Sequence, residues 1–308
     1  MHTDDIVESS HVKETLRKLS LLWRDRAMVN KGPIDHSSIA FHPEKPDFAE
    51  SLLPFSSHPR WVDAEPDLKS MVLSYAWAIY NLKTVYIECD IVTPACEDLI
   101  KSPVGSAGAR YELQQVMTEA LLDEALHTKM SVSACNYIYT HRGLKPIDYV
   151  NFNLVTWRTR LIEKCSSESE RRLTRFAIAC ASETLITDYL KTLSGDAFIQ
   201  PLCREVTHSH SIDEWGHSSV FSVAAEHIVG SLTPSERSYF AGVIPRTVEM
   251  FADNEIGAWS AVFTQIAFPH REEIVRDVQK TGQVKVYQQS VMTLLDKLGL
   301  PVQTDWSG

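Results

Sequence analysis

The stretch HSHSIDEWGHSSV, residues 208–220, gathers three histidines and two acidic residues into its first ten positions. On a helix, residues four and seven apart project in nearly the same direction, so His210, Glu214 and His217 share one face. Imidazole nitrogens and carboxylate oxygens are common ligands of iron, manganese and zinc. The stretch therefore predicts a metal-binding face, whereas His208 is expected to face solvent.

The Glu-x-x-His pair formed by Glu214 and His217 recurs upstream as Glu124 and His127 within LLDEALHTK. A four-helix bundle that holds two metal ions uses one such pair from each of two helices, and a single Glu from each of the other two. We interpret two further matches as chance or surface pairs: Glu8 with His11, and Glu205 with His208.

Two isolated carboxylates complete the pattern. Glu88 lies in TVYIECDIV and Glu183 in FAIACASETLIT, each on a largely apolar helix face where a charge is costly unless it is liganded or paired. Glu88 precedes Glu124 by 36 residues and Glu183 precedes Glu214 by 31, which indicates one helix-pair unit used twice. Taken alone, either Glu could instead be hydrogen-bonded within the core or paired with a base.

The segments that carry these residues have helical periodicity and no alternating, strand-like run. We expect helices at about residues 12–29, 66–91, 109–141, 152–165, 168–193, 199–230 and 233–253. The last of these begins with a capping box, Thr233 to Glu236, with Pro234 at the first helical position. The fold class is all-α, with four long helices at its centre.

Prolines set the boundaries between these helices. Residues 31–62 contain five prolines and predict an extended wrap. Pro94 is expected to end or kink the helix of Glu88, so Glu97, nine residues after Glu88, is a rival ligand of lower rank. We expect a single domain: an N-terminal helix and wrap (1–62), a metal-binding core (about 63–254) and a C-terminal extension (255–308).

Composition narrows the possible partners. The 308 residues carry a net charge of −10 without a basic stripe, so neither nucleic acid nor an anionic membrane is expected as a partner. We find no apolar run long enough for a membrane span and no secretory signal, and we expect a cytoplasmic protein. Six scattered cysteines without CxxC pairs are expected to be reduced.

Four carboxylates would neutralise two divalent cations, and an oxygen-rich set with imidazoles suits iron or manganese better than tetrahedral zinc. Two adjacent Fe(II) ions can deliver two electrons to O₂, which protein side chains cannot do. His210 would add a third nitrogen ligand. A metal-free helical scaffold would instead need Arg or Lys on the same faces, and the sequence shows no such partners.

The ligand order from Glu88 to His217, ending in His-x-x-x-Glu-x-x-His, resembles that of the AurF-like non-haem di-iron N-oxygenases, the p-aminobenzoate N-oxygenase family. The resemblance implies a ferritin-like four-helix bundle core with additional helices, and two bound irons. The implied ligands are Glu88, Glu124, His127, Glu183, His210, Glu214 and His217.

The resemblance also implies O₂-dependent oxidation of an aromatic amine, through an iron-bound peroxide, to hydroxylamine, nitroso and nitro products in natural-product or antibiotic biosynthesis. It further implies a homodimer and an external electron donor such as a reductase. Tyr80 and Lys83 precede Glu88 on its helix and are candidate substrate contacts. Alternatively, Lys83 is a surface lysine, and Tyr80 packs in the core with Trp77 and Tyr86.

Three other di-metal chemistries are alternatives: C–H hydroxylation, desaturation and ferroxidase activity. Iron storage is disfavoured because the additional helices and the proline-rich wrap indicate an enclosed pocket for an organic substrate.

Overall fold

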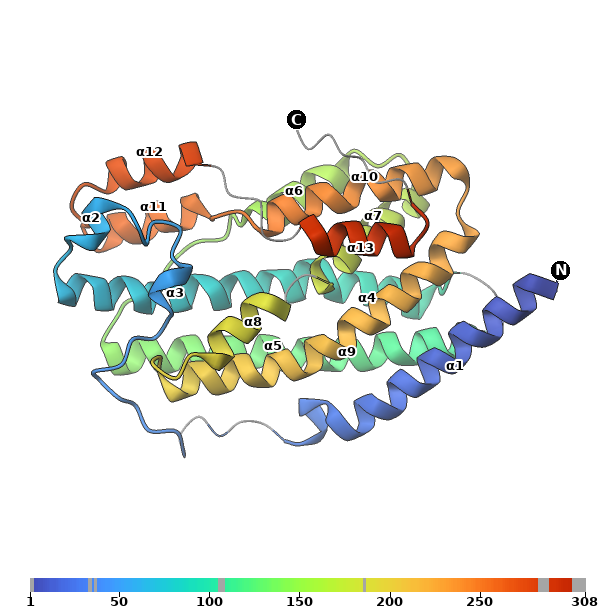
Figure 1. The fold of residues 1–308 in the computed structure, drawn as a ribbon, viewed down its shortest axis with the longest axis horizontal. Helices are drawn as coiled ribbons and strands as arrows, with labels where there is room; N and C mark the ends of the chain where they lie inside the picture. The colour runs from blue at the N-terminus through green and yellow to red at the C-terminus, as the bar shows by residue number, and fades with distance from the viewer. Residues whose placement is uncertain are drawn as a thin grey trace.

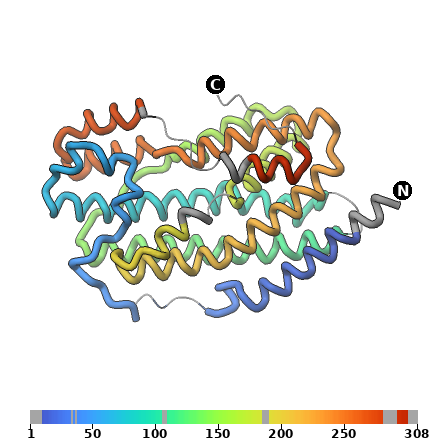
Figure 2. Tube along the Cα trace, viewed as in Figure 1, coloured from blue at the N-terminus to red at the C-terminus, as the bar shows by residue number. Residues whose placement is uncertain are grey.

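The computed structural model describes residues 3–32, 35, 38–104, 109–184, 187–281 and 288–300. Within these ranges every regular element is a helix and no strand occurs, which confirms the all-α prediction (Figure 1). Three of the long helices, α3, α5 and α9, run side by side along the longest axis, as the trace in Figure 2 also shows. None of the described helices is long and apolar enough to cross a membrane.

Four helical segments form the central bundle. They are α3 (Pro66–Ile87) continued by the π-helical segment η4 (Glu88–Val92) and α4 (Thr93–Lys101), α5 (Arg110–Arg142), α7 (Glu168–Glu183) and α9 (Pro201–Ser231). Contacts run from α3 to α5, from α5 to α9, from α9 to α7, and from α7 back to η4 and α4. The four segments therefore enclose a common interior.

The remaining helices cover the bundle. Helix α1 (Thr3–Arg26) and the 3₁₀ turn η1 (Met28–Asn30) pack on α5 and α9, and α8 (Thr187–Gly195) packs on α9. Helices α6 (Asn153–Glu163) and α10 (Pro234–Phe251) pack on α7, with α13 (Gln288–Lys297) on α10. Helix α11 (Ile256–Gln265) contacts α3 and α12 (Arg271–Thr281).

Two apolar clusters form the core, and a polar layer separates them. On α5 the first cluster ends at Ala120 and the second begins at Met130; on α9 the second ends at Val206 and the first resumes at Val220. The predicted ligands of both helices lie in these gaps. Burial of apolar side chains on both sides of the polar layer stabilises the bundle, so the layer itself can hold polar functional residues.

The proline-rich wrap is less regular, as expected, with only short turns at η3 (Glu50–Leu52) and α2 (Pro59–Val62). It is tied to α5 by a buried ion pair in which Arg142 Nε and Nη2 lie 3.0 and 3.1 Å from the two carboxylate oxygens of Asp47. Ser74 donates a further hydrogen bond to the same carboxylate. The predicted capping box is also present, because Thr233 and Glu236 exchange hydrogen bonds between side chain and backbone.

One expectation about helix ends is wrong, and one alternative of a second is excluded. The predicted helix 168–193 is divided, since α7 ends at Glu183 and α8 begins at Thr187. Thr184 Oγ1 bonds back to the carbonyls of Cys180 and Ala181, but Thr207 makes the same pair of bonds within the uninterrupted helix α9, so these bonds alone do not account for the break. Pro94 does not end the helical run, which continues through α4 to Lys101, but the regular α-helix changes to the π-helical segment η4 directly before it, where the N–H of Thr93 bonds to the carbonyl of Glu88.

Candidate metal centre

The structure brings all seven predicted ligands together inside the bundle. Each of the four bundle segments supplies at least one, and none has more than 3% of its surface exposed. The residues and their segments are Glu88 from η4, Glu124 and His127 from α5, Glu183 from α7, and His210, Glu214 and His217 from α9. Glu88 lies in the π-helical segment, a feature that recurs at functional sites.

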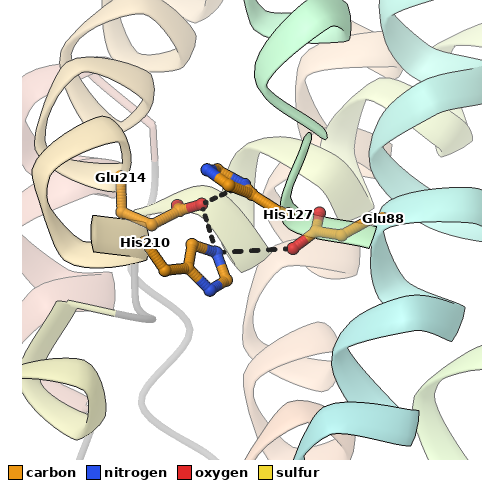
Figure 3. A group of neighbouring side chains, drawn as sticks. All are labelled: Glu88, His127, His210 and Glu214. Atoms are coloured by element: carbon orange, nitrogen blue, oxygen red, sulfur yellow. Dashed lines mark hydrogen bonds and ion pairs between the residues drawn. The ribbon is translucent and has the colours of Figure 1, made fainter. Parts of the chain in front are cut away.

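One part of the cluster is formed by Glu88, His127, His210 and Glu214, whose side chains point toward one another (Figure 3). His210 Nε2 lies 2.9 Å from Glu214 Oε1 and 3.6 Å from Glu88 Oε1. His127 Nδ1 lies 3.5 Å from the same Glu214 oxygen. One ligand atom from each of the four residues falls within 4.8 Å of the others, which is a spacing that a single cation can bridge.

The second part surrounds His217. Its Nδ1 lies 3.0 Å from Glu124 Oε1, 3.2 Å from Glu183 Oε2 and 3.6 Å from Glu214 Oε1. Glu124, His127, Glu214 and His217 form another group within 4.8 Å, and so do Glu88, Glu124 and Glu183. Because the three groups overlap at Glu88, Glu124 and Glu214, the geometry fits two neighbouring ions bridged by carboxylates.

Ionising several buried carboxylates without Lys or Arg nearby is electrostatically unfavourable. Burial, followed by the charges of Glu124 and Glu183, raises the pKa of Glu88 well above its usual range. Burial also opposes a charged His127, but hydrogen bonds to Asp213 and Glu124 outweigh it and raise its pKa to about 10. Without metal, Glu88 and His127 therefore hold protons that partly balance the negative charge of the other carboxylates.

The donor set itself fits metal ions. Glu88 Oε2 and Glu214 Oε2 are buried and have no hydrogen-bond partner within the described chain. None of the ion pairs found among the described residues joins one of the four candidate ligand glutamates to Lys or Arg. Divalent cations would satisfy these oxygens and replace the extra protons.

Two functional residues were missed by the sequence reasoning: Asp123 and Asp213. Asp213 Oδ2 lies 3.1 Å from His127 Nε2, and Asp123 Oδ2 lies 3.1 Å from His217 Nε2. Each aspartate thus accepts a hydrogen bond from the histidine of the opposite helix, leaving that histidine's Nδ1 toward the carboxylates. The signal was present, because Asp directly precedes Glu in both motifs and makes them Asp-Glu-x-x-His.

The N-terminal segment holds both aspartates from outside the bundle. Trp23 Nε1 donates to Asp123 Oδ2 at 2.7 Å, and the backbone N–H of Met28 donates to Asp213 Oδ1 at 2.9 Å. Carboxylates that accept from a ligand histidine fix its orientation and raise its basicity, and Trp23 and Met28 fix the two carboxylates in turn.

The lower-ranked candidates lie elsewhere. Glu97 lies on helix α4, although the helix was expected to end at Pro94. Its side chain is 47% exposed, and its Oε2 lies 2.6 Å from Lys101 Nζ. His208 and Glu205 are exposed on α9, as expected. Glu97 therefore belongs to a surface pair and not to the cluster.

Tyr80 and Lys83 line a cavity of about 450 Å³ between α3, the wrap and the turn after α10. Lys83 is not a simple surface lysine: its side chain is 15% exposed and its ammonium lies 2.9 Å from Glu255 Oε1. Trp77 is fully buried, as the core-packing interpretation expects. Tyr80 and Tyr86 are partly buried against the same apolar cluster.

A helical bundle with two single glutamates, two Glu-x-x-His pairs and a shared buried interior defines a ferritin-like carboxylate–histidine protein. Comparison with known proteins identifies the particular family. The family model "P-aminobenzoate N-oxygenase AurF" matches residues 9–299. The 4-aminobenzoate N-oxygenase of Streptomyces thioluteus is 28% identical over 309 residues, which cover 95% of this chain and 91% of that protein.

The chain belongs to the AurF family of N-oxygenases. The predicted family and the prediction of an oxygenase enzyme are thereby confirmed, and N-oxygenation is favoured over C–H hydroxylation, desaturation or ferroxidase activity.

Proposed function

We propose that the protein is an O₂-dependent di-iron N-oxygenase that oxidises the nitrogen of a small aromatic amine. The observation that carries this proposal is the set of seven buried donors in overlapping groups, with carboxylate oxygens that have no hydrogen-bond partner among the described residues. When bound, two iron ions supply the two electrons that activation of O₂ requires. The relative named for 4-aminobenzoate suggests the aromatic amine as the substrate class.

The residues of this chain would hold the ions and control their surroundings. His127 and His217 would each coordinate an ion through Nδ1, while the Nε2–H group donates a hydrogen bond to an aspartate of the other helix. His210 would add a third nitrogen beside Glu88 and Glu214. The apolar clusters on both sides bury the layer, and a buried, low-dielectric environment strengthens each electrostatic interaction within it.

We further propose that the amine binds in the cavity lined by Tyr80 and Lys83. The cavity follows one face of α3 and includes Thr84 and Ile87, which lie one turn and one residue before Glu88. Its volume is in the range of pockets for small organic ligands.

Several features rest on the family resemblance: iron as the metal, an external electron donor such as a reductase, a homodimer, a cytoplasmic location and a role in natural-product biosynthesis. Manganese would fit the same donor set. Direct metal analysis distinguishes the two.

The first experiment is to measure the metal content per chain after iron-supplemented expression. The reduced protein is then exposed to O₂ with a panel of para-substituted anilines. We expect near two irons per chain and hydroxylamine, nitroso or nitro products. Full folding without any bound metal would refute the proposal, as would bound iron that never oxidises an amine nitrogen.

The ligand set is tested by Glu183→Ala, which removes one of the four carboxylates and should lower metal occupancy sharply. Glu97→Gln is the matched control, since it removes a carboxylate charge from the surface pair with Lys101. If Glu183→Ala keeps as much metal as the control, the assignment of Glu183 is wrong.

A further inference from the structure

The cavity beside α3 has an unusual charge balance. Among the described residues that line it, Lys83 is the one Lys or Arg, whereas Asp253 and Glu255 supply two carboxylates. With the ordinary charges of these groups, the cavity lining carries a net charge of −1.

Lys83 is already engaged within this lining. Its Nζ lies 2.9 Å from Glu255 Oε1 and donates a hydrogen bond of 2.8 Å to the carbonyl of Phe251. The side chains of Lys83 and Glu255 are only 15% and 4% exposed, so water screens the pair weakly. Glu255 is fixed in turn, because its Oε2 accepts a hydrogen bond of 3.1 Å from the backbone of Asn153.

The position of this pair bears on substrate choice. Lys83 lies five residues before Glu88, about 7.5 Å along the helix axis and about 140° around it, whereas Thr84, which also lines the cavity, lies within about 40° of the direction of Glu88. None of the seven ligands is among the described lining residues, so the amine would approach Glu88 at the end of the cavity formed by Thr84 and Ile87. An aniline with its amino group at that end would direct its para substituent toward Lys83 and Glu255. These two groups would then recognise that substituent.

From this charge arrangement we infer that the substrate's distal substituent is an uncharged hydrogen-bonding group such as an amide, and not a carboxylate. The inference rests on the proposed N-oxygenation of an arylamine. A carboxylate would approach two acids and would compete with Glu255 for Lys83, and juxtaposed like charges in a partly desolvated site are unfavourable. An amide can accept from the ammonium and donate to a carboxylate at once.

This specificity would differ from that named for the Streptomyces thioluteus relative, whose substrate carries a carboxylate. The test compares 4-aminobenzamide with 4-aminobenzoate, two anilines that differ only in the distal group. Their affinities for the metal-loaded, reduced enzyme are measured by calorimetry without O₂. We expect the amide to bind roughly tenfold or more tightly.

The variant Glu255→Gln removes one charge and releases Lys83, and it should reduce the preference for the amide by roughly tenfold. Asp253→Asn is a second variant that keeps an acceptor oxygen for the Asn153 side chain and the Glu255 backbone, and it should shift the preference in the same direction. Glu97→Gln, in the exposed pair with Lys101, is the control and should leave the preference unchanged.

Equal or tighter binding of 4-aminobenzoate by the unaltered enzyme would overturn the inference, even if Glu255→Gln failed to fold. So would binding of neither amine, or a preference that neither cavity variant moves. Product analysis keeps the two proposals apart. Oxidation of 4-aminobenzoate as efficiently as the amide would retain N-oxygenation and refute the charge-based specificity, whereas amide binding without oxidation of any amine would refute N-oxygenation.

Discussion

Asp213 and Asp123 have matching positions in the two Asp-Glu-x-x-His motifs, but the structure predicts that their replacement by Asn has unequal effects. Asp213 uses both carboxylate oxygens: Oδ1 accepts from the backbone of Met28 and Oδ2 accepts from His127. Asparagine offers one acceptor oxygen and one donor group. In Asp213→Asn, either the Met28 N–H or the His127 N–H must therefore face another donor.

Asp123 uses a single oxygen for both of its partners. Oδ2 accepts from Trp23 Nε1 and from His217 Nε2, while Oδ1 has no partner within the described chain. In Asp123→Asn the remaining oxygen can serve both donors, and the amide nitrogen takes the place of Oδ1. Both hydrogen bonds behind the metal ligand are then kept, to a weaker, uncharged acceptor, and the cost of burying the amide N–H₂ falls on the stability of the fold.

The magnitudes follow from these contacts. A hydrogen bond to a charged group contributes about 1.5–3 kcal/mol, and loss of a partner behind a ligand histidine typically costs roughly 10–100-fold in metal affinity. We expect Asp213→Asn to fall in this range. Asp123→Asn should lose less than roughly tenfold, which corresponds to about 1.4 kcal/mol.

The assay is anaerobic titration of the metal-free proteins with Fe(II), repeated with Mn(II) because it is less prone to oxidation. Circular dichroism and thermal melts of the metal-free forms establish that both variants fold. An affinity loss in Asp123→Asn that equals or exceeds that in Asp213→Asn would refute the acceptor-counting argument. Unchanged affinity in both variants would refute any role of the aspartates in orienting the histidines.

Three further predictions concern the ligand His210, the protonation of His127 and the Arg142–Asp47 ion pair. His210→Ala should fold and lose only part of its iron, but should change the decay of the absorption that follows O₂ addition, as stopped-flow spectroscopy would reveal; unchanged decay would exclude His210 as a ligand. Stability of the metal-free protein should fall as pH rises from 6.5 toward about 10, because His127 binds its proton more tightly when folded; thermal melts should show this fall, and metal loading should reduce it. Arg142→Ala should cost about 3–5 kcal/mol in denaturant unfolding because it leaves the fully buried Asp47 unpaired, whereas Arg60→Ala, from an exposed pair, should cost about 1 kcal/mol or less.

Much of the ligand set could be predicted because helical periodicity determines which side chains share a face. His210, Glu214 and His217 needed only the 3.6-residue repeat, and their placement did not depend on the exact ends of α9. Glu88 and Glu183 could be selected because each interrupts an apolar face, where an unpartnered charge is costly. The same arguments predicted the four central helices.

Features set by local competition or by distant contacts could not be predicted in this way. The end of α7 at Glu183 is one such feature, because the sequence around it keeps an apolar helical periodicity. Pro94 suggested a helix end, because the pattern gives no sign of the π-helical segment that precedes it. Glu255, the partner of Lys83, lies 172 positions later in the sequence, and no short-range spacing connects the two.

The N-terminal segment is the clearest case of a distant contact that matters for the site. Trp23 and Met28 lie outside the four bundle helices, yet they contact the two aspartates that orient His217 and His127. Because each aspartate serves the histidine of the other helix, a displacement of α1 and η1 together would disturb ligands on both α5 and α9. The ligands come from four segments of the bundle, and their orientation depends on the packing of α1 and η1 as well as on the motifs themselves.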